Sequence, residues 1–136
     1  MKTYPTIGIR PVIDARLLGI REALEDKTRR MAEEARKLIE SNVFYADASP
    51  ARCVIFSGSI GGGEEAARCE TEFAACHVCA TLSVTPSWCY GSETMDTNPF
   101  TVKAVWGFNG TSRPGAVYLA AVMAATDMEP RPLTAT

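Results

Sequence analysis

Apolar and polar positions recur along this chain with two different periods, and segments of the two kinds follow one another in turn. Short apolar runs rich in β-branched residues favour buried strands, whereas longer segments with an apolar position every three or four residues favour helices. The predicted strands are residues 7–13, 53–56, 78–84 and 102–106, and the predicted helices are residues 18–42, 64–75 and 114–125. Strand and helix therefore alternate through most of the chain.

The segment 18–42 shows the helical period most clearly. Its apolar stripe is formed by Leu24, Thr28, Met31, Ala35 and Leu38, and charged residues occupy many of the other positions. Such a pattern is typical of a helix that packs on a core with one side and faces water with the other.

Helix-length connections between strands indicate parallel pairing, because parallel neighbours need a long crossover. The predicted fold is α/β: an open, mostly parallel sheet with helices on both faces, in three layers, of the doubly wound Rossmann or flavodoxin-like type. The length of 136 residues suits one domain with a real core, so residues 1–136 are expected to form a single domain. Residues 132–136 begin like a further strand that stops, so the sheet is expected to have an unpaired edge. An unpaired edge favours pairing with another chain, which predicts self-association of the domain.

Ligands of such folds bind beyond the carboxyl ends of the strands, where the following loops gather. Four loops are expected there: residues 14–16, 57–63, 86–93 and 107–113. The third contains the run SWCYGSET, which begins at Ser87 and places Trp88 after a proline that ends strand pairing.

A tryptophan in that position offers a flat apolar face, which suits the C–H groups of a sugar. Arg16, in the first loop, offers a fork of donors for sugar hydroxyls. The residues therefore predict a carbohydrate site, with a buried tryptophan and a surface ion pair as the structural alternatives.

The net charge and the hydropathy of the chain limit its expected partners and location. The 14 basic and 16 acidic residues leave a net charge of -2, which argues against nucleic acid and anionic lipid as partners. No apolar run approaches the roughly 20 residues of a membrane span, and the first residues lack the features of a signal peptide. A cytoplasmic location without membrane contact is expected.

Two further motifs are better explained by structure than by chemistry. Cys76 and Cys79 flank His77, the only histidine, but residues three apart on a strand point to opposite faces and cannot share a metal ion. The odd number of five cysteines favours reduced thiols. The glycines of residues 58–63 precede a helix, yet the lysine of a phosphate loop is missing and two glutamates follow, so nucleotide binding is not expected.

Three long segments, IGIRPVIDAR (7–16), VTPSWCYGSETMD (84–96) and WGFNGTSRPGAVYLAA (106–121), resemble the amino-terminal domain of L-fucose isomerase. The resemblance implies a role in the aldose–ketose isomerisation of L-fucose to L-fuculose, with D-arabinose to D-ribulose as a possible second reaction. It also implies that the complete enzyme is a hexamer, and that manganese and its glutamate, aspartate and histidine ligands belong to later domains absent here. This chain would then hold no cofactor and no catalytic residue, and would be inactive alone.

The resemblance further implies that this domain forms part of the sugar pocket of a neighbouring subunit. Arg16 and Trp88 occupy the positions of the family's substrate wall, and Tyr90 and Glu93 are additional candidates in the same loop. The expected partners are therefore a small sugar, the remaining isomerase domains and neighbouring subunits. Two alternatives stay open: a stand-alone binding or assembly module, and a small enzyme that uses Glu93 and Asp96.

Overall fold

A computed structural model describes residues 4–110 and 114–125 of the chain. Strands and helices follow in the order β1 (Thr6–Pro11), α1 (Ile20–Asn42), β2 (Arg52–Ile55), α2 (Gly63–Ala75), β3 (Val78–Thr85), α3 (Gly91–Thr94), β4 (Val102–Gly107) and α4 (Ala116–Ala125). The four strands and three helices predicted between residues 7 and 125 are present, with ends that differ by a few residues, and α3 is an addition. Arg113 and the strand expected at residues 132–136 lie outside the described residues.

The strands form one parallel sheet in the order β2-β1-β3-β4. The chain moves from β1 to its neighbour β2 on one side, then crosses to β3 on the other side of β1. This is the order of the first four strands in doubly wound folds of the flavodoxin type. The predicted α/β fold class is confirmed.

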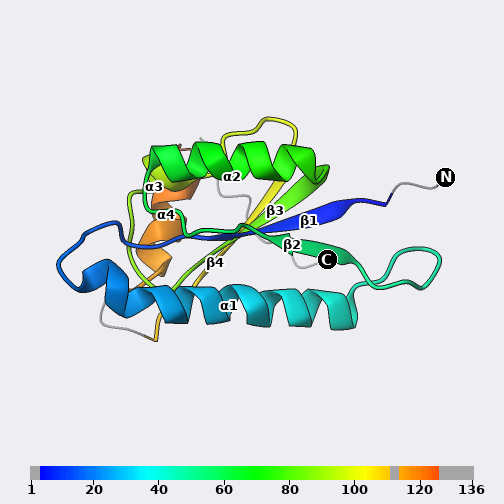
Figure 1. The fold of residues 1–136 in the computed structure, drawn as a ribbon, viewed down its shortest axis with the longest axis horizontal. Coiled ribbons are helices and arrows are strands. Elements are labelled where there is room, and N and C mark those ends of the chain that lie inside the picture. Colours follow the sequence, from blue (N-terminus) through cyan, green and yellow to red (C-terminus); the bar gives the residue numbers. More distant parts are fainter. Residues whose placement is uncertain (1–3, 111–113, 126–136) are drawn as a thin grey trace.

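Helices cover both faces of the sheet (Figure 1). Helix α1 packs on one face, where Met31, Ala32 and Ala35 meet Ile9 and Val84 in a buried cluster. Helices α2 and α4 pack on the other face, and a second cluster joins residues of both helices to the sheet and its loops: Val12, Phe56, Ile60, Cys69, Phe73, Cys89 and Tyr118. The molecule therefore has the three layers that the alternating pattern predicted.

Helix α1 departs from its predicted pattern at both ends. It begins at Ile20 because Leu18 and Gly19 have φ angles of 66° and 91°, a left-handed backbone that turns the chain into the helix. Leu38, predicted on the buried stripe, is 67% exposed. Helix α1 packs on β1, β2 and β3, so Leu38 instead borders an open groove next to the edge strand β4.

Within the described ranges, no helix combines the length and the apolar character that crossing a lipid bilayer requires.

Candidate functional site

The carboxyl ends of β1 and β3 form the natural ligand edge of this sheet. These strands are neighbours, but the chain leaves β1 towards β2 and leaves β3 towards β4, on opposite sides. Doubly wound folds bind their ligands at such a switch point. Arg16 lies in the loop after β1, and Trp88 lies in the loop after β3.

In the loop after β3, buried and exposed residues alternate. Ser87 and Cys89 are buried, whereas Trp88 is partly exposed and Tyr90 is 49% exposed. The Thr85 hydroxyl accepts a hydrogen bond from the Ser87 backbone N–H at 3.3 Å and donates one to the Ser87 carbonyl at 2.9 Å, which tightens the turn. Burial raises the pKa of the Cys89 thiol to about 12, so this cysteine acts as a core anchor and not as a nucleophile.

The short helix α3 continues this anchoring and was not predicted from the sequence. Its four residues are too few for a helical period to show. Arg10, which is 3% exposed, donates to the Thr94 carbonyl at 2.7 Å and to the Ser83 hydroxyl at 2.8 Å, and so ties α3 to β1 and β3. A Cβ atom at Gly91 would lie 3.0 Å from the Ala121 methyl, so α4 can pack closely only on a glycine.

The loop after β1 presents Arg16 in a fixed pair with Asp14. The Asp14 side chain is 1% exposed and the Arg16 side chain is 50% exposed. Arg16 Nη2 donates to Asp14 Oδ2 at 2.6 Å, and Nε lies 3.0 Å from Oδ1 and 3.1 Å from Oδ2. The hydrogen bonds to Asp14 raise the pKa of Arg16, which is therefore positively charged throughout the physiological range.

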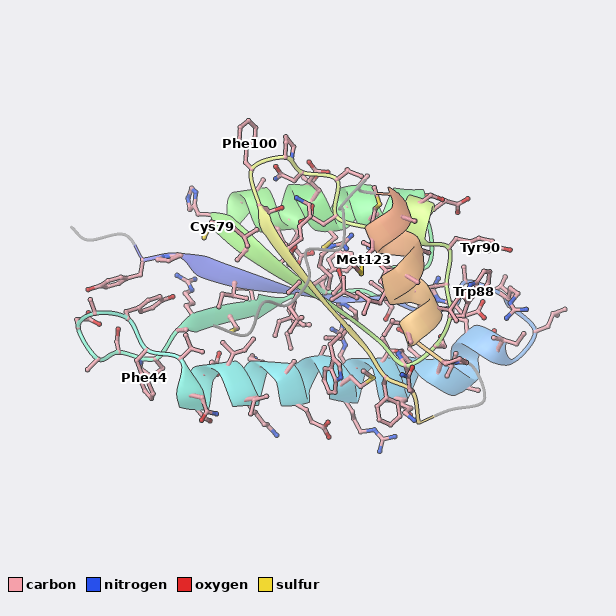
Figure 2. All side chains as sticks on the ribbon, turned by 180° about the vertical axis from the view of Figure 1, so that it is seen from behind. Phe44, Cys79, Trp88, Tyr90, Phe100 and Met123 are labelled. Atoms are coloured by element: carbon pink, nitrogen blue, oxygen red, sulfur yellow. The ribbon has the colours of Figure 1, made fainter. Side chains whose placement is uncertain are left out.

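Arg16, Trp88 and Tyr90 form a continuous row, which we call the wall. The Arg16 guanidinium carbon lies 5.7 Å from the Trp88 ring centroid, within reach of a cation–π contact. The Trp88 and Tyr90 ring centroids are 4.7 Å apart at an interplanar angle of 68°, an edge-to-face arrangement. Figure 2 shows both rings at the end of the molecule where α1 begins, opposite the end that carries Cys79 and Phe44.

The structure thus brings together three of the four predicted site residues. Trp88 is not sealed in the interior, so the alternative of a buried tryptophan is excluded. The other alternative, an ion pair, is present, because Arg16 pairs with Asp14. That the wall binds a substrate stays a prediction.

Glu93 lies elsewhere, in the first turn of α3, with its side chain exposed. Together with Asp96 it lines a pocket of about 250 Å³ between α2 and residues 92–101. Asp96 accepts hydrogen bonds from the hydroxyls of Thr81 at 2.7 Å and Thr101 at 2.5 Å. Burial raises the pKa of Asp96, but these hydrogen bonds outweigh burial and lower it overall. An ionised, fully engaged carboxylate is poorly suited to act as a general acid, which weakens the alternative of a small enzyme.

The two motifs that were assigned to structure lie at the two ends of α2. Cys76 is the C-cap of α2 and only Cys79 lies on β3, so the argument that both cysteines lie on one strand does not apply. Cys79 is exposed and Cys76 is half-buried, and the five thiols are free. In the glycine-rich loop the Gly61 N–H donates to the Glu65 carboxylate at 2.9 Å, so this backbone donor is already bonded to a glutamate of α2.

A metal site finds no support in the residues that the structure describes, where no three or more histidine, cysteine or acidic side chains converge as ligands. The resemblance assigns manganese to later domains, and that assignment stays a prediction.

Asp14 is the functional candidate that the sequence did not reveal. An aspartate two residues before an arginine, directly after a buried strand, was the available signal, but the spacing does not show whether its carboxylate points to solvent or to the arginine.

Fold and geometry together define a doubly wound α/β domain with an aromatic and guanidinium wall at its ligand edge. Residues 4–132 match the family model described as L-fucose isomerase, first N-terminal domain. The chain belongs to the L-fucose isomerase family, as the resemblance of its three long segments indicated.

Individual relatives agree with this assignment. The L-fucose isomerases of Clostridium perfringens, Bacteroides fragilis and Streptococcus pneumoniae are 61%, 57% and 55% identical to this chain over 123, 124 and 124 residues. The matches cover 90%, 91% and 91% of this chain and 21% of each relative. The chain therefore spans about a fifth of the length of the curated relatives that it matches.

Proposed function

We propose that this chain is a substrate-recognition domain of an L-fucose isomerase, and that Arg16, Trp88 and Tyr90 form one wall of the sugar pocket. The observation that supports this proposal best is the contact between the Arg16 guanidinium and the Trp88 indole at the switch point between β1 and β3. The two residues come from separate loops and meet where doubly wound folds bind their ligands.

The chemistry of the wall suits a neutral sugar. The exposed part of the indole offers apolar surface to the C–H groups of the ligand. Among the described residues, the Arg16 side chain is hydrogen-bonded to Asp14 alone, through Nε and Nη2. Its Nη1 group thus remains to donate to a sugar hydroxyl.

The reaction itself is assigned to other parts of the enzyme. The conversion is the isomerisation of L-fucose to L-fuculose, with D-arabinose to D-ribulose as a second reaction. Manganese, when bound by those other parts, polarises the substrate oxygens during this kind of proton transfer. The part of the chain that the structure covers offers no ligand set for the ion, so we expect the chain alone to be inactive. A cytoplasmic location belongs to the same proposal.

We also propose that the chain works within a homo-oligomeric assembly, a hexamer of the complete enzyme. The support is an apolar groove of about 530 Å³ beside strand β4, which among the described residues is lined by Leu38, Leu82 and Trp106. Parallel sheets are normally covered on both faces, and exposed apolar grooves of this kind are typical of contact surfaces.

The test of sugar recognition uses the two tryptophans of the chain as paired reporters. The chain is labelled with fluorotryptophan, and Trp88→Phe and Trp106→Phe variants assign the fluorine NMR signals. L-Fucose is then titrated into the chain alone and into the chain fused to the remaining part of the Clostridium perfringens isomerase. We expect the Trp88 signal to shift only in the fusion, and the Trp106 signal to stay unchanged.

The possible results separate the functions. A Trp88 shift with the chain alone indicates a stand-alone binding module, and isomerase activity of the chain alone indicates a small enzyme. No Trp88 shift in an active fusion refutes the wall. Assembly is tested by sedimentation velocity: Trp106→Glu should reduce self-association of the chain, and a chain that is monomeric at high concentration contradicts the assembly proposal.

A further inference from the structure

We propose that Asp14 is a positioning residue for the sugar site, which holds the Arg16 guanidinium against the Trp88 indole and offsets its charge. This inference rests on the proposed function, because it concerns the same wall. It goes further in assigning a role to a buried carboxylate.

The geometry of the pair is that of a clamp. Asp14 accepts from Arg16 Nε and Nη2 at distances between 2.6 and 3.1 Å, and also from the Arg16 backbone N–H at 3.1 Å. One carboxylate therefore holds both the side chain and the main chain of the arginine. Such two-point contact fixes the plane of a guanidinium, which a single hydrogen bond does not.

The carboxylate is itself held by the sheet. The residues before Asp14 are bound on both sides: the Val12 N–H donates to the Val84 carbonyl at 2.8 Å, and the Ile13 N–H donates to the Ile60 carbonyl at 2.9 Å. These bonds connect the start of the loop to β3 and to the loop after β2. The buried Asp14 side chain is thus fixed relative to the sheet, and through it the half-exposed Arg16 side chain is fixed as well.

This rigidity matters because a half-exposed arginine normally samples many rotamers, which a ligand must restrict at a cost in free energy. With Nε and Nη2 held by Asp14, the guanidinium is already placed over the indole before the sugar arrives. A preorganised donor beside an aromatic face increases affinity without any additional contact to the sugar.

The pair also sets the charge of the wall. Arg16 alone would favour anions, but the carboxylate beside it offsets that charge. Hydroxyl groups accept hydrogen bonds from such a pair, whereas a phosphate gains little from it and meets a carboxylate nearby.

The test is a double-mutant cycle with Asp14→Asn and Arg16→Ala in the fusion described above, with L-fucose affinity as the readout. Asparagine keeps the shape of Asp14, but it carries no charge and can accept hydrogen bonds through only one atom. We expect Asp14→Asn to weaken L-fucose binding about tenfold in the parent, and to have no further effect once Arg16 is alanine. Equal weakening in both backgrounds would show that Asp14 acts through the fold and would overturn the proposal.

A second readout needs no sugar. In the fluorotryptophan-labelled chain, Asp14→Asn should move the Trp88 signal towards its position in Arg16→Ala and leave the Trp106 signal in place. An unmoved Trp88 signal overturns the proposal. Glu33→Gln is the matched control, because Glu33 also pairs with an arginine at 2.6 Å, on the exposed side of α1, and it should change neither readout.

A third readout tests the ligand class. The ratio of affinities for L-fucose and L-fucose 1-phosphate should fall at least tenfold in Asp14→Asn, and an unchanged ratio would remove the charge argument. If Asp14→Asn does not fold, Asp14→Glu replaces it in the same double-mutant cycle. Glutamate keeps the charge but displaces the carboxylate by one methylene. If Arg16→Ala and Trp88→Ala leave the L-fucose affinity unchanged, the proposed function fails. The Trp88 fluorine signal of the chain without sugar then still tests whether Asp14 positions Arg16.

Discussion

Trp88→Ala should separate the stability of this domain from its recognition of sugar. The indole makes two contacts that the structure defines, with the Arg16 guanidinium and with the Tyr90 ring. A cation–π contact at an exposed site contributes about 0.5–1 kcal/mol, and an edge-to-face aromatic pair contributes about 0.5–1.5 kcal/mol. The expected loss in the free energy of unfolding is therefore about 1–2.5 kcal/mol.

The matched comparison is Phe73→Ala on α2. Phe73 is 5% exposed and belongs to the core cluster between α2 and the sheet. Truncation of a buried phenylalanine costs about 3–5 kcal/mol, because a cavity is left behind. For a domain of this size 1 kcal/mol changes Tm by roughly 3–5 °C, so the two variants should be well separated.

The assay is thermal and urea denaturation followed by far-ultraviolet circular dichroism, which does not depend on tryptophan emission. Trp88→Ala should unfold cooperatively with a modest fall in Tm, while the fusion loses L-fucose affinity. A fall as large as that of Phe73→Ala would show that the indole is a core residue, and the reasoning that places it on a ligand wall would be refuted.

Three other predictions concern the scaffold. Gly8→Ala should cost about 1–3 kcal/mol by urea denaturation, because the new methyl would lie 2.4–2.9 Å from the Phe73 ring; an unchanged midpoint would contradict it. Iodoacetamide should label the exposed Cys79 and spare the buried Cys53, Cys69 and Cys89, because burial raises the pKa of these three thiols to about 11 or 12. Mass spectrometry of the natively labelled chain measures the labelling, and equal labelling of the buried thiols would contradict this prediction. The hydrogen bond from Arg21 lowers the pKa of Glu65, so this pair stabilises the fold above about pH 4.5 and the effect is lost as pH falls through the lowered pKa. Glu65→Gln should therefore reduce Tm at pH 7 and flatten its decline in acid, and parallel pH profiles for parent and variant would argue against the pair.

Much of the fold follows from local patterns. The four apolar runs became the strands β1 to β4, and the helical periods became α1, α2 and α4. Side-chain periodicity is a property of the local backbone, so a single sequence carries it. Helix α3 was not predicted because its four residues form a single turn, which shows no helical period. Leu38 was wrongly predicted to be buried because the apolar pattern of a helix does not show how far the opposing sheet extends.

The sequence by itself determined the alternation of strands and helices, the family, and the residue types Arg16 and Trp88 in loops that follow strands. Only the tertiary structure decided that β1 and β3 are neighbours, which brings these two loops into contact. It also decided that the Asp14 carboxylate turns to Arg16 while Cys89 turns to the core. The physical reason is that strand order and loop direction depend on packing between segments distant in the chain, and local spacing does not encode that packing.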